Sequence, residues 1–341
     1  MSLQVFHKCL VVRLSSACLT RKHERFAVSL SMTAYNCLMP HVIVLAGGTS
    51  DEREVSLRSG ASVAKALEKN SYQVDILDPS DGLDNLLPEL QKADIVFPAL
   101  HGAGGEDGVL QKFLEDHGIR YVGPDSRASA LCYDKARYTR LLQDSDILAP
   151  ETELVDLHEF QASSLSKKPF ALKPNDGGSS IDTFILRDLA STDDEAIRAA
   201  FSRHKKLLLQ ELIEGDEITI AMLGNEPLPA IEIIPPEGSE FDYENKYNGQ
   251  TQELCPPKHV SPVLQQQAQK LTAKIHQMTG CRDMSRTDIM VTAGGELYVL
   301  ETNTIPGLTD ESLLPKAASE AGYDMPTLCQ KLVQMALHRN T

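Results

Sequence analysis

The sequence contains no tryptophan, and aromatic residues make up only 5% of its 341 positions. Hydrophobic residues still account for 42%, which is enough for one large domain or for two to three modest domains with real cores. No apolar run is long enough to span a membrane. We therefore expect a globular chain with no membrane partner.

Positive charge is also scarce, and the formal net charge is -15. A polyanion-binding protein needs a basic surface, and no dense run of Lys or Arg occurs beyond the N-terminal segment, so nucleic acid is not expected as a partner. The seven cysteines show no CxxC spacing. This pattern indicates neither a disulfide framework nor a zinc site and fits a reducing cytosol, so we expect a cytoplasmic protein.

Residues 1–38 differ from the rest of the chain. They are basic, serine-rich and poor in acid, as transit peptides are, but Arg13 interrupts their apolar stretch. Met39 stands directly before the first clean strand. Residues 1–38 are thus an N-terminal extension, expected to be disordered or to follow an upstream start that is seldom or never used, and we favour the unused start over a transit peptide.

From residue 39 onward, apolar strands alternate with amphipathic helices. The expected βαβαβ elements lie at residues 42–46, 55–67, 72–78, 83–90 and 94–100, followed by a helix over 109–117 and a short strand over 119–123. This order predicts a doubly wound parallel sheet.

Two glycine-containing loops follow strands of this sheet, at the edge where open α/β sheets bind small molecules. Gly47 and Gly48 could bring backbone amides to a ligand or form an ordinary tight turn. The loop HGAGGEDG begins at His101, which is either a satisfied structural histidine or a residue that faces a ligand. Glu52 either supplies negative charge at a helix start or holds a substrate ammonium.

The middle of the chain carries two lysines suited to phosphate binding. Residues 126–148 are expected to be helical, with Lys135 early in the run, and a strand over 170–172 leads through Lys173 into the loop 175–180. Such a loop can place amides over phosphate oxygens while Lys173 acts as a point charge, although a surface hairpin is the alternative. The GxxxxGK[ST] order is absent, which disfavours a P-loop enzyme.

Residues 206–218 are expected to form a strand that could line a purine pocket. Such a pocket needs an apolar clamp, backbone groups for the base edge and an acid for the ribose, and the segment could supply these from residues 210–213 and Glu217. An edge strand with ordinary polar positions is the alternative. Residues 235–257 lack periodicity, and Lys246 between Tyr243 and Tyr247 favours an ordered lid. Further helices are expected at 261–278, 312–321 and 325–338.

The most informative segment is 285–313, which begins with two strands joined by a turn at 293–295. Side chains alternate along a strand, so Glu301 and Asn303 share a face that Asp288 on the partner strand can meet, with Arg286 beside it. Oxygen ligands of this kind suit Mg²⁺, and an adjacent arginine would offset charge in phosphoryl or acyl-phosphate chemistry. A solvated hairpin is the alternative, but apolar neighbours such as Leu300 argue against it.

Six segments in this order, GGTSDEREVS, LHGAGGEDG, ALKPNDGGSS, DYENKY, SRTDIMV and LETNTIPGLT, closely resemble the D-alanine:D-alanine ligase family of ATP-grasp enzymes, over about residues 40–338. The resemblance implies an α/β chain with an α+β C-terminal part, in which an ATP-grasp fold follows a doubly wound parallel-sheet domain. The implied domains are 39–133, 134–212 and 213–341, with ATP between the last two.

The implied activity is the ATP-dependent joining of two D-alanines through an acyl phosphate, which supplies peptidoglycan precursor synthesis. Two Mg²⁺ ions would take part, with Mn²⁺ as the alternative ion. A homodimer is expected from the family alone.

The resemblance also assigns residues to roles. Asp288, Glu301 and Asn303 would hold the metal ions. ATP would be bound by Lys135, Lys173, Gln210, Glu211, Leu212, Ile213, Glu217 and Lys246. The catalytic residues would be Glu52 for the first ammonium, Arg286 and the Gly307 backbone for the oxyanion, Ser312 for the second carboxylate, and Ser179 and Tyr247, which close the lid through Glu52. Leu313 would bind the second substrate, and His101 would lie near the first.

Two positions depart from the family pattern. Asp182 stands where glycine is common, which bears on the mobility of the phosphate loop, and Gln210 stands where an acid is frequent, which bears on nucleotide contacts. Tyr247 favours a dipeptide product, because ligases that join D-alanine to D-lactate tend to carry another residue there. The alternatives are a D-lactate or other ATP-grasp ligase, and a nucleotide-binding regulator without catalysis.

Overall fold

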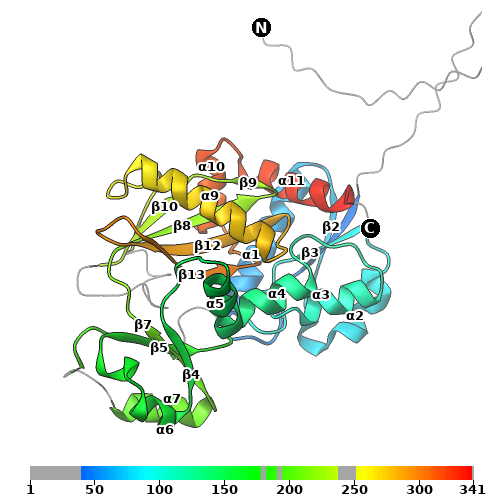
Figure 1. The fold of residues 1–341 in the computed structure, drawn as a ribbon. Helices are drawn as coiled ribbons and strands as arrows, with labels where there is room; N and C mark the ends of the chain where they lie inside the picture. The colour runs from blue at the N-terminus through cyan, green and yellow to red at the C-terminus, as the bar shows by residue number, and fades with distance from the viewer. Residues whose placement is uncertain (1–39, 178–181, 190–193, 237–250, 340–341) are drawn as a thin grey trace, which may run out of the picture. The chain divides into compact units, whose positions relative to one another are not determined.

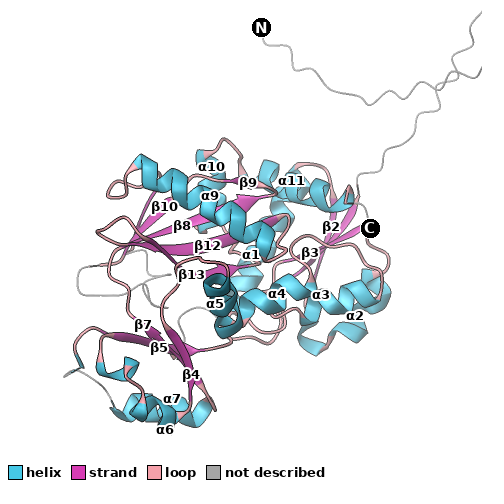
Figure 2. Ribbon diagram, in the orientation of Figure 1, coloured by secondary structure: helices cyan, strands magenta, loops and turns pink. Residues whose placement is uncertain are grey.

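The computed structural model describes residues 40–177, 182–189, 194–236 and 251–339, and within them the strands form three sheets (Figures 1 and 2). The strands are β1 His41–Leu45, β2 Gln73–Leu77, β3 Ile95–Pro98, β4 Thr152–Val155, β5 Phe170–Pro174, β6 Phe184–Leu186, β7 Leu207–Glu211, β8 Asp216–Leu223, β9 Glu226–Pro227, β10 Ile231–Ile234, β11 Gln252–Leu254, β12 Met284–Val291 and β13 Leu297–Asn303. The α-helices are α1 Arg53–Lys69, α2 Leu83–Leu90, α3 Val109–Asp116, α4 Ser126–Tyr133, α5 Lys135–Asp144, α6 Leu157–Ala162, α7 Asp194–Arg203, α9 Pro262–Met278, α10 Leu313–Glu320 and α11 Met325–Leu337, and the 3-10 helices are η1 Pro79–Asp81 and η2 Leu165–Lys167.

The first sheet is parallel, in the order β2-β1-β3, as the βαβαβ pattern predicts. Its central strand β1 is buried on both faces because alternate residues enter different cores. Val42 and Val44 pack in one cluster with residues of α1 and α11, and Ile43 and Leu45 pack in another with residues of α2 and α3. The strand expected at 119–123 is wrong, because that segment forms only one bridge, from Tyr121 to β3.

The second sheet is antiparallel, in the order β4-β7-β5-β6. One face packs on α6 and α7 through Phe170, Leu172 and Leu209. Because residues alternate along a strand, Lys173 and Gln210 fall on the opposite face. This sheet therefore has one apolar face in a core and one polar face available to a ligand.

The third sheet is also antiparallel, in the order β11-β10-β8-β12-β13, with β9 paired to β8. Residues such as Ile218 and Ile289 share a core with residues of α5 and α9, and Figure 1 shows α9 crossing this sheet. The opposite face carries Glu217, Arg286 and Asp288, again by alternation. The polar faces of the second and third sheets thus supply the walls of one cleft.

Two of the expected elements are divided. Residues 126–148 form two helices, because the side chain of Asp134 accepts a hydrogen bond from the backbone N–H of Arg137 at 3.1 Å and starts α5 as its N-cap. Residues 206–218 contain β7 and the start of β8 rather than one strand. Gly215 lies between them, where a Cβ would come within 2.2 Å of the carbonyl oxygen of Val291, so only glycine fits the turn.

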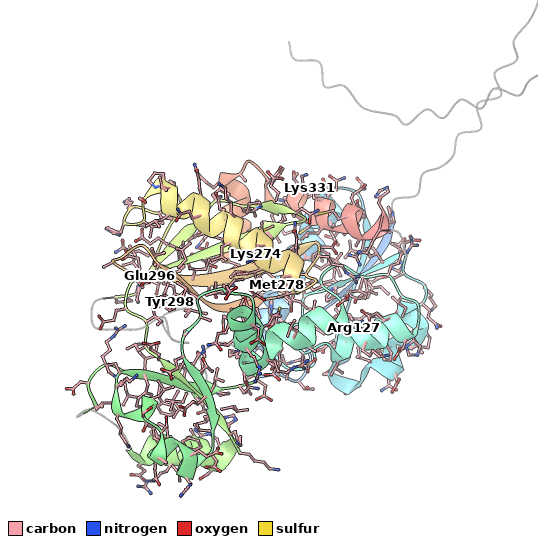
Figure 3. The ribbon with its side chains drawn as sticks, in the orientation of Figure 1. Arg127, Lys274, Met278, Glu296, Tyr298 and Lys331 are labelled. Atoms are coloured by element: carbon pink, nitrogen blue, oxygen red, sulfur yellow. The ribbon has the colours of Figure 1, made fainter. Side chains whose placement is uncertain are left out.

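The three helices expected at 261–278, 312–321 and 325–338 are confirmed as α9, α10 and α11. Exposed side chains such as Arg127, Lys274 and Lys331 project from the outer faces of α4, α9 and α11 (Figure 3). None of the helices in the described ranges combines the length and apolar character needed to cross a membrane.

Candidate active site

The hairpin of β12 and β13 brings the predicted metal ligands together. In its antiparallel register Asp288 lies opposite Glu301, and Arg286 lies opposite Asn303. Thr292 and Gly295 close the turn between the strands. The predicted shared face of Asp288, Glu301 and Asn303 follows directly from this pairing.

Arg286 and Asp288 form a bidentate ion pair on that face. Nε and Nη2 of Arg286 donate to the two oxygens of Asp288 at 3.1 and 3.0 Å, and only 16% and 12% of the two side chains are exposed. The hydroxyl of Thr219 on β8 also donates to Asp288, at 2.5 Å. Burial opposes the charge of the guanidinium, but Asp288 and Glu301 raise the pKa of Arg286 above its ordinary value, so it stays protonated.

A β-bulge separates the pairs on either side of Leu300. Asp288 is opposite Glu301, but the next residue, Ile289, is opposite Val299, so Leu300 is the extra residue. In a regular strand Val299 and Glu301 would share a face. With the bulge, Val299 enters the core while both Leu300 and Glu301 line the cleft. Period-two reasoning from the sequence does not reveal this contribution of Leu300.

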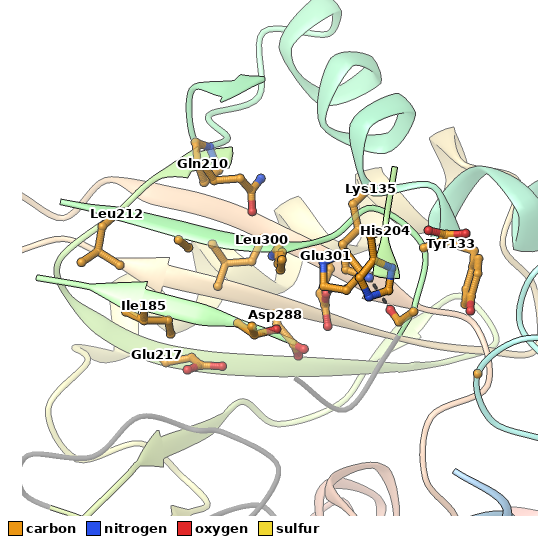
Figure 4. A pocket seen from close by; sticks show the side chains of 18 of the residues that line it. Tyr133, Lys135, Ile185, His204, Gln210, Leu212, Glu217, Asp288, Leu300 and Glu301 are labelled. Atoms are coloured by element: carbon orange, nitrogen blue, oxygen red, sulfur yellow. Dashed lines mark hydrogen bonds and ion pairs between the residues drawn. The ribbon is translucent and has the colours of Figure 1, made fainter. Parts of the chain in front are cut away.

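The cleft has a volume of about 530 Å³, within the usual range for a small-molecule site. Figure 4 shows that its walls come from distant segments, with Gln210 and Leu212 across the opening from Asp288 and Glu217. It is lined by ten of the residues predicted from the sequence, namely Glu52, Lys135, Lys173, Gln210, Glu211, Leu212, Ile213, Glu217, Asp288 and Glu301.

Lys135 and Lys173 place positive charge beside the carboxylates. Nζ of Lys135 donates to the carbonyl of Gly177 at 2.5 Å and lies 3.8 Å from Glu301, with 11% of the side chain exposed. Lys173 lines the same cleft from β5. Two lysines and two carboxylates in one partly buried space suit a phosphate ligand that brings its own divalent cation.

Gln210 is buried in the wall of the cleft that the second sheet supplies. Its Nε2 donates to Thr152 Oγ1 at 3.0 Å, and that hydroxyl donates to the carbonyl of Pro150 at 2.8 Å. The amide therefore has a partner that accepts a hydrogen bond, which a carboxylate in its place would lack. This explains why glutamine fits at a position where an acid was expected from the family pattern.

Asp182 has a positive φ of 52°, a conformation that favours glycine. Its carboxylate accepts from Nε of Arg203 at 3.0 Å and lies 2.8 Å from Nε2 of His204, at the end of α7. The hydrogen bond from Arg203 and the charge of that residue lower the pKa of Asp182. His204 also lines the cleft, a contribution that the sequence analysis missed.

Glu52 reaches the cleft beside the glycine-rich loop. A Cβ on Gly102, whose φ is 72°, would lie 2.7 Å from Oε2 of Glu52. Glycine at this position therefore lets the carboxylate lie against the backbone of the loop. By contrast, the N–H groups of Gly47 and Gly48 donate to Ser56 and Asp78 at 2.8 and 2.9 Å, so the tight-turn interpretation of these glycines is the one the structure supports.

Residues 304–312 connect the hairpin to α10. A Cβ on Gly307 would come within 2.7 Å of Ser312 Oγ, so the backbone of the loop lies directly against this hydroxyl. Ser312 is the N-cap of α10 and Leu313 is its first residue. Backbone amides at a helix start are suited to a carboxylate, which agrees with the predicted role of this pair.

His101 and Glu106 meet this connection from the glycine-rich loop. Only 5% of His101 is exposed, and burial lowers its pKa to about 4, so the ring is neutral. Glu106 is half-buried, and burial together with the charge of Glu52 raises its pKa to about 8. Glu106 was not predicted as a site residue, although its place among four glycines was the available signal.

The oxygen donors fit a hard cation, because Asp288 and Glu301 face each other with the amide of Asn303 beside them. Within the described residues no group of three or more His, Cys, Asp or Glu side chains is arranged for a metal ion. Mg²⁺ sites in proteins commonly combine one or two carboxylates with waters and substrate phosphates. The predicted roles of Ser179, Lys246 and Tyr247 fall on residues outside the described ranges.

Comparisons with known proteins agree with this geometry. Residues 78–124 match the family model for the D-ala D-ala ligase N-terminus, and residues 141–334 match that for the D-ala D-ala ligase C-terminus. A D-alanine--D-alanine ligase of Maridesulfovibrio salexigens is 38% identical over 299 residues, which cover 86% of this chain and 98% of that protein.

Solved structures show the same fold. The Bacillus anthracis D-alanine--D-alanine ligase complexed with ATP has a TM-score of 0.74 at 29% identity, covering 87% of this chain and 97% of that one. The VanG D-Ala:D-Ser ligase of Enterococcus faecalis has a TM-score of 0.72 at 28% identity, covering 87% and 99%. The expected ATP-grasp fold behind a parallel-sheet domain is confirmed, and the chain belongs to the D-alanine–D-alanine ligase family.

Proposed function

We propose that the protein joins two D-alanines to D-alanyl-D-alanine, with ATP converted to ADP and phosphate, as a step in peptidoglycan precursor synthesis. Family membership supports the reaction. The observation that carries it is the single cleft in which Lys135, Lys173, Asp288, Glu301 and Glu52 meet, since it combines phosphate-binding cations, metal-binding carboxylates and an ammonium-binding acid.

ATP would lie between the second and third sheets. The base would contact residues 210–213 and Leu300, and Glu217 would bind the ribose hydroxyls. Lys135 and Lys173 would hold the phosphates, and Lys246 would join them from the segment 237–250. A base between apolar side chains and a polyphosphate beside lysines match the apolar and charged ends of the cleft.

Asp288, Glu301 and Asn303 would hold Mg²⁺, or Mn²⁺, which when bound would supply charge neutralisation for the phosphates. The chain's own cations contribute to the same end. Arg286 remains charged beside Asp288, and Lys135 lies beside Glu301. Phosphoryl transfer depends mainly on positioning and charge neutralisation, which are what these residues provide.

The chemistry proceeds in two displacements. Glu52 holds the ammonium of the first D-alanine, whose carboxylate oxygen attacks the γ-phosphorus, so that ADP leaves and an acyl phosphate forms. The amine of the second D-alanine then attacks the acyl carbon, phosphate leaves, and the amine loses a proton. Arg286 and the Gly307 N–H stabilise the tetrahedral oxyanion that exists after the amine attacks and before phosphate leaves. Ser312 and Leu313 hold the carboxylate of the second D-alanine.

An acyl phosphate must be protected from water. Ser179 and Tyr247 would close the site through Glu52, and His101 would act near the first substrate. The division into domains 39–133, 134–212 and 213–341 is supported by the three sheets, because the strands of each sheet fall within one of these ranges.

Cytoplasmic location and a homodimer complete the proposal. The supply of ATP and the cysteines argue for the cytoplasm, since Cys132, Cys255, Cys281 and Cys329 are all free thiols in the described part of the chain. The homodimer is proposed from membership of the family alone. Light scattering at several protein concentrations tests it.

The test of the function is to measure phosphate release from ATP in the presence of Mg²⁺. The substrates compared are D-alanine, L-alanine, and D-alanine together with D-lactate or D-serine, and the product is identified by its mass. We expect release only with D-alanine and a D-alanyl-D-alanine product. D-serine is included because a D-Ala:D-Ser ligase shares the fold. ATP binding without turnover on any acceptor would contradict the proposal and favour a regulator.

A further inference from the structure

The backbone of Ile305 is held from the glycine-rich loop at both of its polar atoms. Its N–H donates to Oε1 of Glu106 at 3.4 Å, and its carbonyl accepts from Nδ1 of His101 at 3.1 Å. The second oxygen of Glu106 accepts from the N–H of Gly102 at 2.9 Å. One carboxylate therefore links the loop that starts at His101 to the segment that follows β13.

A third contact holds the same segment three residues later. The N–H of Leu308 donates to Ser59 Oγ on α1 at 3.4 Å, and Ser59 Oγ lies 3.0 Å from Nε2 of His101. Both Ser59 and His101 are buried. Residues 305 and 308 are thus fixed from the first domain, and Gly307 lies between them.

A neutral His101 gives each of these bonds one direction. Nδ1–H donates to the Ile305 carbonyl, so Nε2 of a neutral ring is unprotonated and accepts from the Ser59 hydroxyl. The oxygen of that hydroxyl keeps its lone pairs for another donor, and it accepts from Leu308 N–H. A second ring proton, on Nε2, would instead leave the Ser59 hydroxyl proton without this acceptor. Burial of the ring favours the neutral form.

We propose that Glu106, His101 and Ser59 are positioning residues that fix residues 305–308 so that the Gly307 N–H is aimed at the reacting carbonyl. We call the hydrogen bonds from Glu106, His101 and Ser59 to residues 305–308 the clamp. The clamp is a property of the folded chain, whereas its catalytic consequence rests on the proposed function. It gives the first domain a role in forming the oxyanion site, in addition to substrate binding through Glu52.

Glutamine at position 106 is the sharpest perturbation. Glu106 accepts from two backbone N–H groups, whereas glutamine offers one oxygen and turns an NH₂ group toward the other donor. Glu106→Gln therefore keeps the size of the side chain and breaks one of the two bonds. Glu115→Gln is the matched control, because Glu115 also accepts from a backbone N–H, that of Ser126 at 3.0 Å, at an exposed site on α3.

The full-length protein is compared with both variants at pH 9, where the Glu106 carboxylate is ionised. Hydrogen exchange of peptides covering residues 301–311 reports the clamp without reference to activity. In Glu106→Gln we expect faster exchange in this segment and a kcat for dipeptide formation lower by roughly 10²-fold, with the KM for ATP nearly unchanged, because misplacing an oxyanion donor affects the transition state more than nucleotide binding. Glu115→Gln should match the wild type in all three measurements.

Unchanged exchange across 301–311 in Glu106→Gln would overturn the clamp, and faster exchange with unchanged kcat would overturn its catalytic consequence. If Glu106→Gln fails to fold, Ser59→Ala tests the same segment from α1, since it removes both the acceptor for Leu308 N–H and the partner of His101 Nε2. A wild-type protein that makes no dipeptide would refute the proposed function, while the exchange measurement would still decide the clamp.

Discussion

Replacing Arg286 by alanine removes the guanidinium that the proposed mechanism places at the oxyanion. In the free protein this group makes two hydrogen bonds to Asp288 and is largely buried beside Glu301. The variant keeps both carboxylates but loses the cation between them. We expect a folded protein that still binds ATP and turns over slowly.

The magnitude follows from the contact distances. Arg286 approaches the oxygens of Asp288 to about 3 Å, and an oxyanion at about 4 Å from the charge would gain about 4 kcal/mol at an effective dielectric constant of about 20. Loss of one oxyanion-hole donor in other enzymes costs about 2.7–4 kcal/mol. Both estimates correspond to a fall in kcat of roughly 10²- to 10³-fold.

The assay is initial-rate release of ADP with D-alanine, together with mass detection of the dipeptide. Arg282→Ala is the control, because Arg282 donates to the Gly123 carbonyl at 2.9 Å and lies over the ring of Tyr121, away from the cleft. Its turnover should match the wild type. A kcat for Arg286→Ala within about fivefold of wild type would refute the assignment, since about 1 kcal/mol is too little for a charge at the oxyanion.

Three further predictions concern stability, each measured as the midpoint of thermal unfolding. Asp182→Gly should change the midpoint little, because relief of the strain at the positive φ offsets loss of the ion pair with Arg203. Asp182→Ala loses the ion pair and keeps the strain, so it should lower the midpoint. Equal midpoints for the two variants would contradict strain at this residue. Gln210→Glu should lower the midpoint by a few degrees, because its carboxylate would face the hydroxyl oxygen of Thr152, whose O–H already donates to the Pro150 carbonyl; a midpoint that stays unchanged would show that this hydroxyl reorients. The pKa of Glu106 is raised from 4.5 to about 8 by burial and by Glu52, so its contribution to stability is greatest below pH 4.5 and declines as pH rises to about 8. Glu106→Gln should therefore flatten this decline, and parallel pH profiles for the two proteins would exclude the shift.

The hairpin was predictable because its determinants are local. Alternation along two short strands and a Gly-Gly turn between them determine which side chains share a face, and the observed pairing of Asp288 with Glu301 follows from that pattern. The bulge at Leu300 was not predictable. Leucine reads as one more apolar position, and nothing in the sequence distinguishes an extra residue from a paired one.

The divided helix shows a signal that was present but ambiguous. Residues 126–148 contain no glycine or proline, and the first proline after them is Pro150, so their pattern predicts one helix. Asp134 marks the break as an N-cap. An aspartate in the middle of a helical pattern also fits an exposed position, so only the backbone reveals which role it has.

The clamp on Ile305 lay beyond sequence reasoning for a different reason. Glu106 and Ile305 are 199 residues apart, and His101 and Ile305 are 204 apart. No periodicity connects such positions, and the bonds use backbone atoms of Ile305 that its identity does not reveal. Sequence patterns found many of the residues that face the cleft, although not His204 or Leu300, but they did not show which residues hold another segment in place.

The bulge separates two properties of the cleft. Because Asp288 already pairs with Glu301 and Ile289 with Val299, a chain without Leu300 could form a regular ladder with the same partners. Leu300 therefore serves the cleft and not the sheet. Under the proposed function, the side chain at position 300 could change while Asp288 and Glu301 keep their register, so selectivity for the base and the geometry of the metal ligands would be open to change independently.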